Sequence, residues 1–409
     1  MSEKWKEAKK KAEHYGQKNI LRFFDELDDA GRDRLSAQIL ETDFSVLSGL
    51  HQQSGGEKGK ITPMEAMKLP EIERRKEEFR EAGLKEIRKG RVAAVLLAGG
   101  MGTRLGSDAP KGVYNIGLTK EVYIFQRLVE NLLEVVHETD TWIDLYVMTS
   151  EKNDEMTRSF FAEKNYFGYQ ESSVFFFRQE TAPATDYEGQ IYLEEKDRMA
   201  TSPNGNGGWV LSLEKTEIGK RITEKGIAWL NVFAVDNVLQ RIADPVFVGA
   251  TVLENCLVGE KVIRKNAPDE KVGAICLEDG RPSIIEYYEL TPELMAAKDE
   301  NGENAYDFGV ILNYLFNLEE LRRIADKELP LHRVEKKIPY ISENGEHIKP
   351  EKPNGYKFEA LVLDMVREMD RCLAFEVERE KEFAPIKNKT GVDSVESARE
   401  LLRRNGIDL

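Results

Sequence analysis

Up to about residue 88, apolar residues recur at the three- and four-residue spacing of amphipathic helices. The segments 20–27 and 36–40 show this spacing, and the charged run 71–89 is typical of a solvated helix. The Gly- and Gln-rich segment 52–60 predicts a flexible loop, and Thr62 before Pro63 predicts the start of a helix. We therefore expect a helical N-terminal region over residues 1–88.

From residue 91 onward, short apolar runs alternate with helical stretches. The runs 92–97, 145–148, 174–177, 227–235 and 272–276 suit strands that are buried on both faces, and a helix is expected from residue 123. This order predicts an α/β fold of Rossmann-like type, with a mostly parallel mixed sheet and helices on both faces. Ligands of such sheets bind at the carboxyl ends of the strands.

The last part of the chain mixes turn signals with apolar periodicity. The spacing predicts a helix over 358–372, a strand over 373–378 and an amphipathic helix over 394–404. The expected organisation is thus the helical region 1–88, a large α/β domain over 89–387 and a short C-terminal helical extension over 388–409.

A glycine-rich turn follows the first expected strand of the α/β region. Gly99, Gly100 and Gly102 let backbone N–H groups approach an anion, and Arg104 and Lys111 supply positive charge. The dinucleotide fingerprint G-x-G-x-x-G does not fit, because its third glycine is displaced by one position, and no P-loop motif lies near this strand. A glycine turn alone is also typical of ordinary strand-to-helix connections. Together with the Pro-Lys-Gly motif at 110–112, it predicts a site for a nucleoside triphosphate.

A carboxylate follows another of the expected strands. Asp236 comes directly after the apolar run 227–235, where it would lie beside the phosphates. Carboxylate and phosphate oxygens are ligands that Mg²⁺ prefers, so Asp236 is a candidate metal ligand. The alternative at this position is an aspartate that caps a helix.

Composition narrows the class of protein. The chain has 409 residues, 41% of them hydrophobic, which is enough for a sizeable core. A net charge of −15 argues against a nucleic-acid or membrane partner, since such binders usually carry a basic face. Three widely spaced cysteines predict neither disulfides nor a zinc site, and no apolar run is long enough to span a membrane. We expect a cytoplasmic protein.

Several spaced motifs occur in the order in which they are found in one known family. They are Met-Thr-Ser at 148–150, Pro-Asn-Gly-Asn-Gly-Gly at 203–208, Val-Asp-Asn at 235–237, Ala-Asp-Pro at 243–245, Glu-Tyr at 286–287, Lys-Lys-Ile-Pro-Tyr at 336–340, Lys-Pro-Asn-Gly at 352–355 and Phe-Ala-Pro-Ile-Lys-Asn at 383–388. With the glycine turn, they make residues 44–388 resemble the UTP–sugar-1-phosphate uridylyltransferases, and most closely the UDP-N-acetylhexosamine pyrophosphorylases.

The resemblance implies a reaction and the residues that perform it. UTP and a sugar 1-phosphate, such as N-acetylglucosamine 1-phosphate, would give a UDP-sugar and pyrophosphate by in-line attack on the α-phosphorus. Catalysis of this kind needs positioning and charge neutralisation rather than a protein nucleophile. The residues implied on the phosphates are Arg104, Lys111 and Lys387, with Asp236 on Mg²⁺, all within the catalytic nucleotidyltransferase domain of 89–387.

The resemblance also assigns residues to the nucleotide and the sugar. Implied nucleotide-binding residues are Gly99, Gly100, Gly102, Gln179 and Gly205. The amide of Gln179 suits the uracil edge, because it offers both a donor and an acceptor. Implied sugar-binding residues are Asn206, Gly273, Glu286, Tyr287 and Val310.

One departure from the family pattern concerns the sugar. Val310 stands where the resembled enzymes have an asparagine that contacts the sugar, and two family aromatics become Leu361 and Leu363. Losing a polar contact costs about 1–3 kcal/mol for that substrate. N-acetylglucosamine, N-acetylgalactosamine, glucose and galactose 1-phosphates therefore all stay open, as does the alternative of a UTP–glucose-1-phosphate uridylyltransferase. A non-catalytic nucleotide-sugar sensor is a further alternative, and a monomer or weak homo-oligomer is expected.

Overall fold

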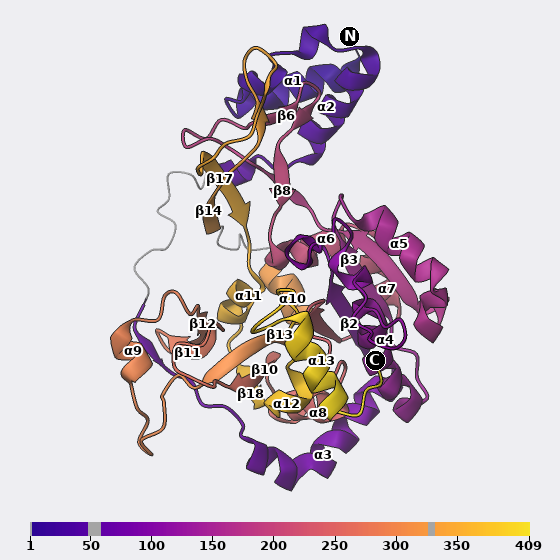
Figure 1. The fold of residues 1–409 in the computed structure, drawn as a ribbon, viewed down its shortest axis with the longest axis vertical. Helices are drawn as coiled ribbons and strands as arrows, with labels where there is room; N and C mark the ends of the chain where they lie inside the picture. Colours follow the sequence, from indigo (N-terminus) through magenta and orange to yellow (C-terminus); the bar gives the residue numbers. More distant parts are fainter. Residues whose placement is uncertain (1, 48–58, 326–331) are drawn as a thin grey trace. The chain divides into compact units, whose positions relative to one another are not determined.

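The computed structural model describes residues 2–47, 59–325 and 332–409, which form two compact units (Figure 1). Unit 1 consists of Met1–Glu57, Gln179–Gly208 and Leu329–Val362, and unit 2 of Lys58–Arg178, Trp209–Glu328 and Leu363–Leu409. Each unit thus combines three separate stretches of chain, and these limits differ from the linear regions expected above. Most of the loop expected over 52–60 lies outside the described residues.

Unit 1 contains two helices, α1 (Glu3–His14) and α2 (Asp29–Glu41), over a small core. The helix expected over 20–27 is wrong, since the chain forms two 3-10 turns, Lys18–Leu21 and Phe24–Glu26. Ile20, Phe23 and Phe24 nevertheless all lie in the same small core. Four short antiparallel ribbons complete the unit: β5 (Thr181–Pro183) with β8 (Thr201–Pro203), β6 (Leu193–Glu195) with β7 (Arg198–Met199), β14 (His332–Lys336) with β17 (Gly355–Glu359), and β15 (Tyr340–Ile341) with β16 (His347–Ile348).

Unit 2 is built on a 10-stranded mixed sheet. The strands are β1 (Ile61–Pro63), β2 (Val92–Leu97), β3 (Leu145–Thr149), β4 (Val174–Arg178), β9 (Trp229–Ala234), β10 (Val258–Arg264), β11 (Ala274–Glu278), β12 (Arg281–Ile285), β13 (Phe308–Asn317) and β18 (Cys372–Glu376). Their order is β1-β11-β13-β9-β2-β3-β4, with β10 beside β13, β18 beside β10 and β12 beside β11. Strands β9, β2, β3 and β4 are mutually parallel, and β13 runs antiparallel to β9.

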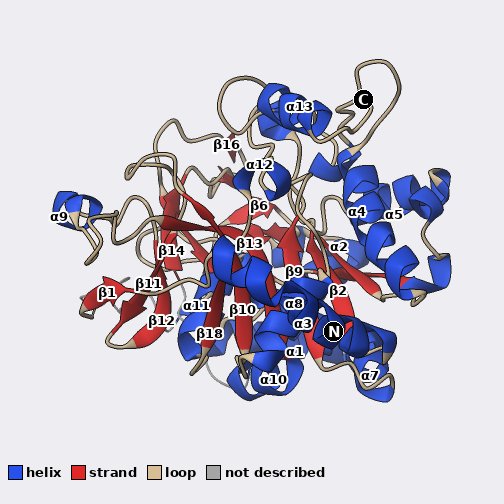
Figure 2. Cartoon of the chain, turned by 90° about the horizontal axis from the view of Figure 1, so that it is seen from below, coloured by secondary structure: helices blue, strands red, loops and turns tan. Residues whose placement is uncertain are grey.

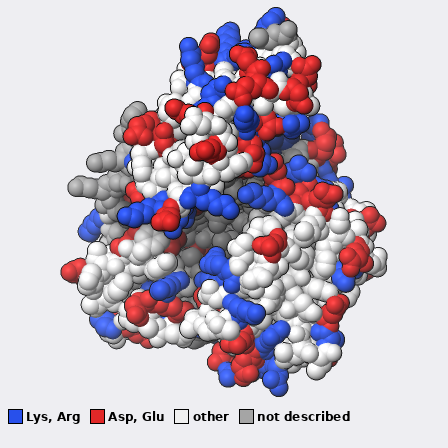
Figure 3. Space-filling view, turned by 45° about the horizontal axis from the view of Figure 1, so that its top comes forward, with Lys and Arg blue, Asp and Glu red and all other residues white. Residues whose placement is uncertain are grey.

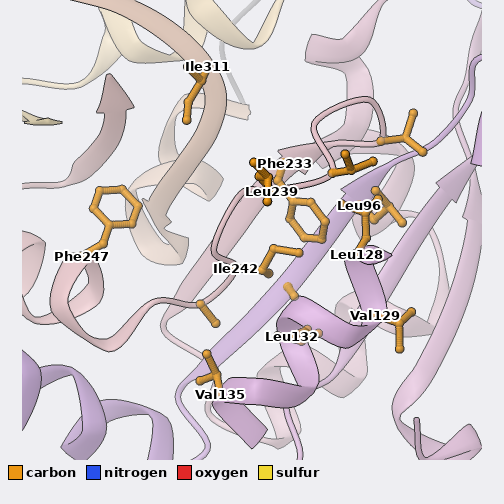
Figure 4. Packing of buried hydrophobic residues seen from close by; sticks show 14 of the residues in the cluster. Leu96, Leu128, Val129, Leu132, Val135, Phe233, Leu239, Ile242, Phe247 and Ile311 are labelled. Carbon is orange, nitrogen blue, oxygen red and sulfur yellow. The ribbon is translucent and has the colours of Figure 1, made fainter. Parts of the chain in front are cut away.

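Helices cover both faces of this sheet, which confirms the expected α/β class. On one face, α4 (Ile124–Thr139) packs Leu128 and Leu132 toward Leu96 of β2 and Phe233 of β9 (Figure 4). On the other face, Arg221 of α7 (Glu217–Glu224) lies over the ring of Phe175 in β4. The other helices of unit 2 are α3 (Leu69–Arg88), α5 (Asp154–Glu163), α6 (Trp209–Glu214), α8 (Pro245–Leu253), α9 (Pro292–Ala296), α10 (Leu318–Ala325), α12 (Arg379–Glu382) and α13 (Val395–Arg404), while α11 (Val362–Glu368) begins at the last residue of unit 1.

Helix α3 is amphipathic rather than simply solvated, because it packs closely against α8. The two helices lie side by side in Figures 1 and 2. A Cβ added at Gly83 would lie 1.9 Å from the carbonyl oxygen of Pro245, and one added at Gly249 would lie 1.7 Å from that of Phe79. The absence of side chains at these two glycines thus lets the helix backbones touch.

Strand pairing explains two further differences from the expected elements. The helix expected over 358–372 is reduced to α11, because 355–359 pairs with β14 and 372–376 pairs with β10. Thr62 and Pro63 lie in β1, which pairs with β11, so the helix that they were expected to start begins at Leu69 instead. The final helix is confirmed, with Ser394 as its N-cap.

The surface view shows Lys and Arg interspersed with Asp and Glu over the face that it displays (Figure 3). In the part of the chain that the structure describes, no helix is both long and apolar enough to cross a membrane.

Candidate active site

The register of β2 and β9 brings the glycine turn and Asp236 to the same edge of the sheet. Leu97 lies opposite Ala234 in this parallel pair, so both strands end side by side. The glycine turn leaves β2 and folds back on itself, with Gly102 N–H donating to the Ala109 carbonyl (2.8 Å) and Lys111 N–H donating to that of Gly100 (3.1 Å). These bonds return Lys111 to the carboxyl end of β2.

Lys111 is positioned by the residue that follows it. A Cβ at Gly112 would lie 2.2 Å from the ring of Phe125 in α4, so only glycine fits there. The close packing of this turn on α4 fixes the backbone on which the Lys111 side chain stands. The Pro-Lys-Gly motif thus has a packing reason as well as a chemical one.

Three other predicted residues of the phosphate site gather around Lys111. Its Nζ lies 3.7 Å from Oδ2 of Asp236, and both side chains are largely buried. Burial lowers the pKa of Lys111, Asp236 opposes this effect, and the nearby positive charges of Arg104 and Lys387 lower the pKa further. Three cations and one carboxylate from distant parts of the sequence therefore meet at the carboxyl edge of β2 and β9.

The three cations differ in their partners. Lys387 Nζ lies 3.0 Å from Oδ2 of Asp393, and the Lys387 N–H donates to the Asp393 carbonyl (2.7 Å). Arg104 is exposed, and no carboxylate among the described residues forms an ion pair with it. Arg104 is thus the cation most available to an incoming anion.

The glycine turn itself is supported by a residue that sequence reasoning missed. The side-chain amide of Asn153 donates to the carbonyls of Ala98 (2.9 Å) and Gly100 (3.3 Å) and accepts from Ser150 N–H (2.7 Å). The only local signal was its place just after the Met-Thr-Ser motif. The N–H of Gly102 is used within the turn, and the expected contact of this residue with the nucleotide stays a prediction.

Three of the predicted sugar-binding residues also lie together. A Cβ added at Gly273 would lie 3.5 Å from a methyl group of Val310 and 3.7 Å from the carboxyl carbon of Glu286. Val310 N–H donates to the Gly273 carbonyl (2.9 Å), which ties β13 to the start of β11. Tyr287, which follows Glu286 in the chain, is 37% exposed. This group is smaller and more apolar than the cationic group around Lys111.

The remaining predicted residues, Gln179, Gly205 and Asn206, belong to unit 1. Gln179 is buried, and Gly205 has a φ of +88° and would place a Cβ 2.2 Å from the Ala360 carbonyl oxygen. Asn206 Oδ1 accepts from Val362 N–H (3.0 Å), so part of its side chain serves the local fold. Their roles toward uracil and sugar stay predictions, as do those of Leu361 and Leu363.

Asp236 could serve as a ligand of a magnesium ion whose remaining coordination positions would be filled by substrate phosphates and water. Among residues 2–47, 59–325 and 332–409, no three His, Cys, Asp or Glu side chains come together as an all-protein metal site. Mg²⁺ usually takes only one or two carboxylates and fills its octahedron with phosphates and water. A single carboxylate beside three cations that are predicted to bind phosphates is compatible with that requirement.

The fold and the charge cluster are typical of a protein that binds nucleotide phosphates at the carboxyl edge of a Rossmann-like sheet. The family model described as UTP–glucose-1-phosphate uridylyltransferase matches residues 46–404, and the chain belongs to this family. It is therefore a nucleotidyltransferase of the class that transfers uridylyl groups from UTP to sugar 1-phosphates.

Relatives in several organisms support this membership. The chain is 40% identical over 344 residues to the UDP-N-acetylhexosamine pyrophosphorylase-like protein 1 of Homo sapiens, covering 81% of this chain and 67% of that protein. It is 34% identical to the UDP-N-acetylglucosamine pyrophosphorylase of Saccharomyces cerevisiae, and the match covers 93% of this chain and 82% of that protein. The crystal structure of the corresponding Trypanosoma brucei enzyme in complex with an inhibitor has a TM-score of 0.85 and 27% identity, covering 98% of this chain and 85% of that one.

Proposed function

We propose that this protein converts UTP and N-acetylglucosamine 1-phosphate into UDP-N-acetylglucosamine and pyrophosphate in the presence of Mg²⁺. The observation that carries this proposal is the meeting of Arg104, Lys111, Asp236 and Lys387 at one edge of the sheet. We call these four residues the phosphate end of the site, and Gly273, Glu286 and Val310 its sugar end. The choice of sugar rests on the names of the relatives.

The reaction is a displacement at phosphorus. A phosphate oxygen of the sugar 1-phosphate bonds to the α-phosphorus of UTP while the bond to the bridging oxygen breaks, and pyrophosphate leaves with that oxygen. The negative charge on the reacting phosphates must be neutralised for the two substrates to approach. A bound Mg²⁺ would supply part of that neutralisation, held by Asp236.

The protein's own residues would hold and align the phosphates. Arg104, exposed and without an ion-pair partner among the described carboxylates, suits the β- and γ-phosphates that become pyrophosphate. Lys111, held on the Phe125-packed turn, suits the α-phosphate or the incoming sugar phosphate. Lys387 reaches the same cluster but must exchange Asp393 for phosphate. Each such contact is worth about 10²–10³ in rate.

A pyrophosphate-release assay tests this function. The purified full chain is given UTP and Mg²⁺ with the 1-phosphates of N-acetylglucosamine, N-acetylgalactosamine, glucose or galactose, and CTP, ATP and dTTP serve as nucleotide controls. We expect the highest kcat/KM with UTP and N-acetylglucosamine 1-phosphate. A clear preference for glucose 1-phosphate would replace the proposed sugar. Binding of UDP-sugar without turnover on any pair would contradict catalysis and indicate a sensor.

A further inference from the structure

The segment that carries Lys387 is held against the end of β9 by a small group of buried hydrogen bonds. Ile386 N–H donates to the carbonyl of Asp236 (2.9 Å), and Val238 N–H donates to that of Ala384 (3.3 Å). Asp236 and Lys387 are far apart in sequence, so this contact is what brings the carboxylate and the ammonium group to one place.

Asn237 forms the centre of the contact. Its side-chain Nδ2 donates to the Glu382 carbonyl (2.7 Å), and its Oδ1 accepts from Ala384 N–H (2.9 Å). The residue is 1% exposed. A primary amide supplies a donor and an acceptor on one planar group, which is what a carbonyl and an N–H two residues apart require. An aspartate would lose the donor, and an apolar side chain would leave both main-chain groups unpaired.

A buried ion pair also anchors the start of the same segment. Lys261 of β10 is fully buried, and its Nζ lies 2.6 Å from Oε2 of Glu382 and 3.3 Å from Oδ2 of Asp244. Arg241 N–H also donates to Oε2 of Glu382 (3.2 Å). Burying a lysine is costly unless charged partners surround it, and here the partners hold the residue from which the Lys387 segment departs.

We propose that Asn237 is a positioning residue that sets the place of Lys387 relative to Asp236. The proposal rests on the proposed roles of those two residues and adds one that touches no substrate. Replacing the Asn237 amide frees the 383–387 segment from the end of β9, so Lys387 no longer meets the phosphates in a fixed geometry. A misplacement of about 1 Å in such a group costs up to about 10²-fold in rate.

A double-mutant cycle between Asn237 and Lys387 tests the proposal. In the wild-type background, we expect Asn237→Ala to lower kcat by ~10–10²-fold. In a Lys387→Ala background, the same change should lower kcat by less than about two-fold, because the group that it positions is already gone. Circular dichroism and thermal unfolding of each variant establish that the proteins compared are folded.

Asn231→Ala is the matched control. Asn231 is also 1% exposed and forms three hydrogen bonds, with Asn313, Tyr314 and Ala243, and none of these bonds reaches the 382–387 segment. We expect this variant to change kcat by the same factor whether or not Lys387 is present. If Asn237→Ala does not fold, Asn237→Asp, which keeps the volume and the acceptor for Ala384 N–H, goes through the same cycle.

Two results would overturn the positioning role. One is an equal loss from Asn237→Ala in both backgrounds, which would indicate a general effect on the fold. The other is full activity of Lys387→Ala, since Asn237 would then position a residue of no importance. In that second case, UDP-sugar formation by the wild-type chain still supports the proposed reaction, so the two proposals fail separately.

Discussion

The phosphate end and the sugar end lie on one sheet but are built in different ways. The phosphate end draws charged side chains from three separate stretches of chain around Lys111. The sugar end joins Gly273 and Val310 through a direct hydrogen bond between β11 and β13, with Glu286 beside them. Charge acts over several ångströms, whereas sugar recognition depends on short contacts. We therefore expect the phosphate end to define the reaction class and the sugar end to differ between family members, as the resemblance implies at Val310.

The largest effect that we expect comes from removing the central cation of the phosphate end. Lys111→Ala should lower kcat by ~10²–10³-fold, because charge on the reacting phosphates loses its buried counter-ion. Steady-state pyrophosphate release measures this. Lys120→Ala is the control, since Lys120 is an exposed lysine paired with Asp408, and its loss should change kcat by less than about two-fold. Equal kcat values for the two variants would remove Lys111 from the mechanism.

The second prediction distinguishes the role of the Asp236 carboxylate from the roles of the three cations. Asp236→Asn should shift the dependence of rate on Mg²⁺ to at least ~10-fold higher concentration and lower the maximal rate, because the amide is a weaker ligand than the carboxylate. Titration of Mg²⁺ after EDTA treatment measures both. Asp393→Asn also removes a carboxylate next to a cation, yet we expect its Mg²⁺ curve to match that of the wild type. A matching curve for Asp236→Asn as well would mean that Asp236 does not hold the metal.

The third prediction concerns the sugar end. Val310→Asn restores the amide that the resembled enzymes carry, and one polar contact is worth about 1–3 kcal/mol, or ~5–150-fold in kcat/KM. We expect the ratio of kcat/KM between N-acetylglucosamine and glucose 1-phosphates to change by a factor in this range, with little change in KM for UTP. Val310→Ala, which alters volume but adds no polar group, is the control. An unchanged ratio would show that Val310 does not select the sugar.

The smallest effect on turnover is expected from Glu260 in β10. Glu260 is buried with one oxygen unpaired in the described structure, and burial raises its pKa from the ordinary value of 4.5 to about 8 despite the hydroxyl of Tyr314. Between these values the folded chain keeps the proton that the unfolded chain has lost. Raising the pH through this window therefore lowers the free energy of unfolding, by up to about 5 kcal/mol.

Glu260→Gln tests that statement without touching either end of the site. The neutral amide should flatten the pH dependence of the unfolding free energy between about pH 5 and about pH 8, while kcat near neutral pH changes less than about two-fold. Urea unfolding at several pH values measures the first quantity and the pyrophosphate assay the second. The same pH slope in both proteins would mean that Glu260 does not titrate as described.

Sequence patterns predicted the parts of the fold that depend on local periodicity. The apolar run 92–97 became β2 with the same limits, and Ser394 caps the final helix. The pattern failed where distant partners decided the outcome. The segment 358–372 has helical spacing, but pairing with β14 and β10 turned its two ends into strands. Likewise, the segment 20–27 has helical spacing yet forms two 3-10 turns, and its residues Ile20, Phe23 and Phe24 lie in a shared core.

For the site, the sequence by itself determined which chemical groups are present and the order in which the chain presents them. The glycine turn, its arginine and lysine, and the carboxylate after a buried strand could all be read locally, because a strand end and a tight turn have strong residue preferences. Lys387 was implied only by the family resemblance, and it is the tertiary structure that brings it beside them. That depends on Asn237 and Lys261 reaching partners far along the chain, and a contact between distant residues leaves no periodic mark in the sequence.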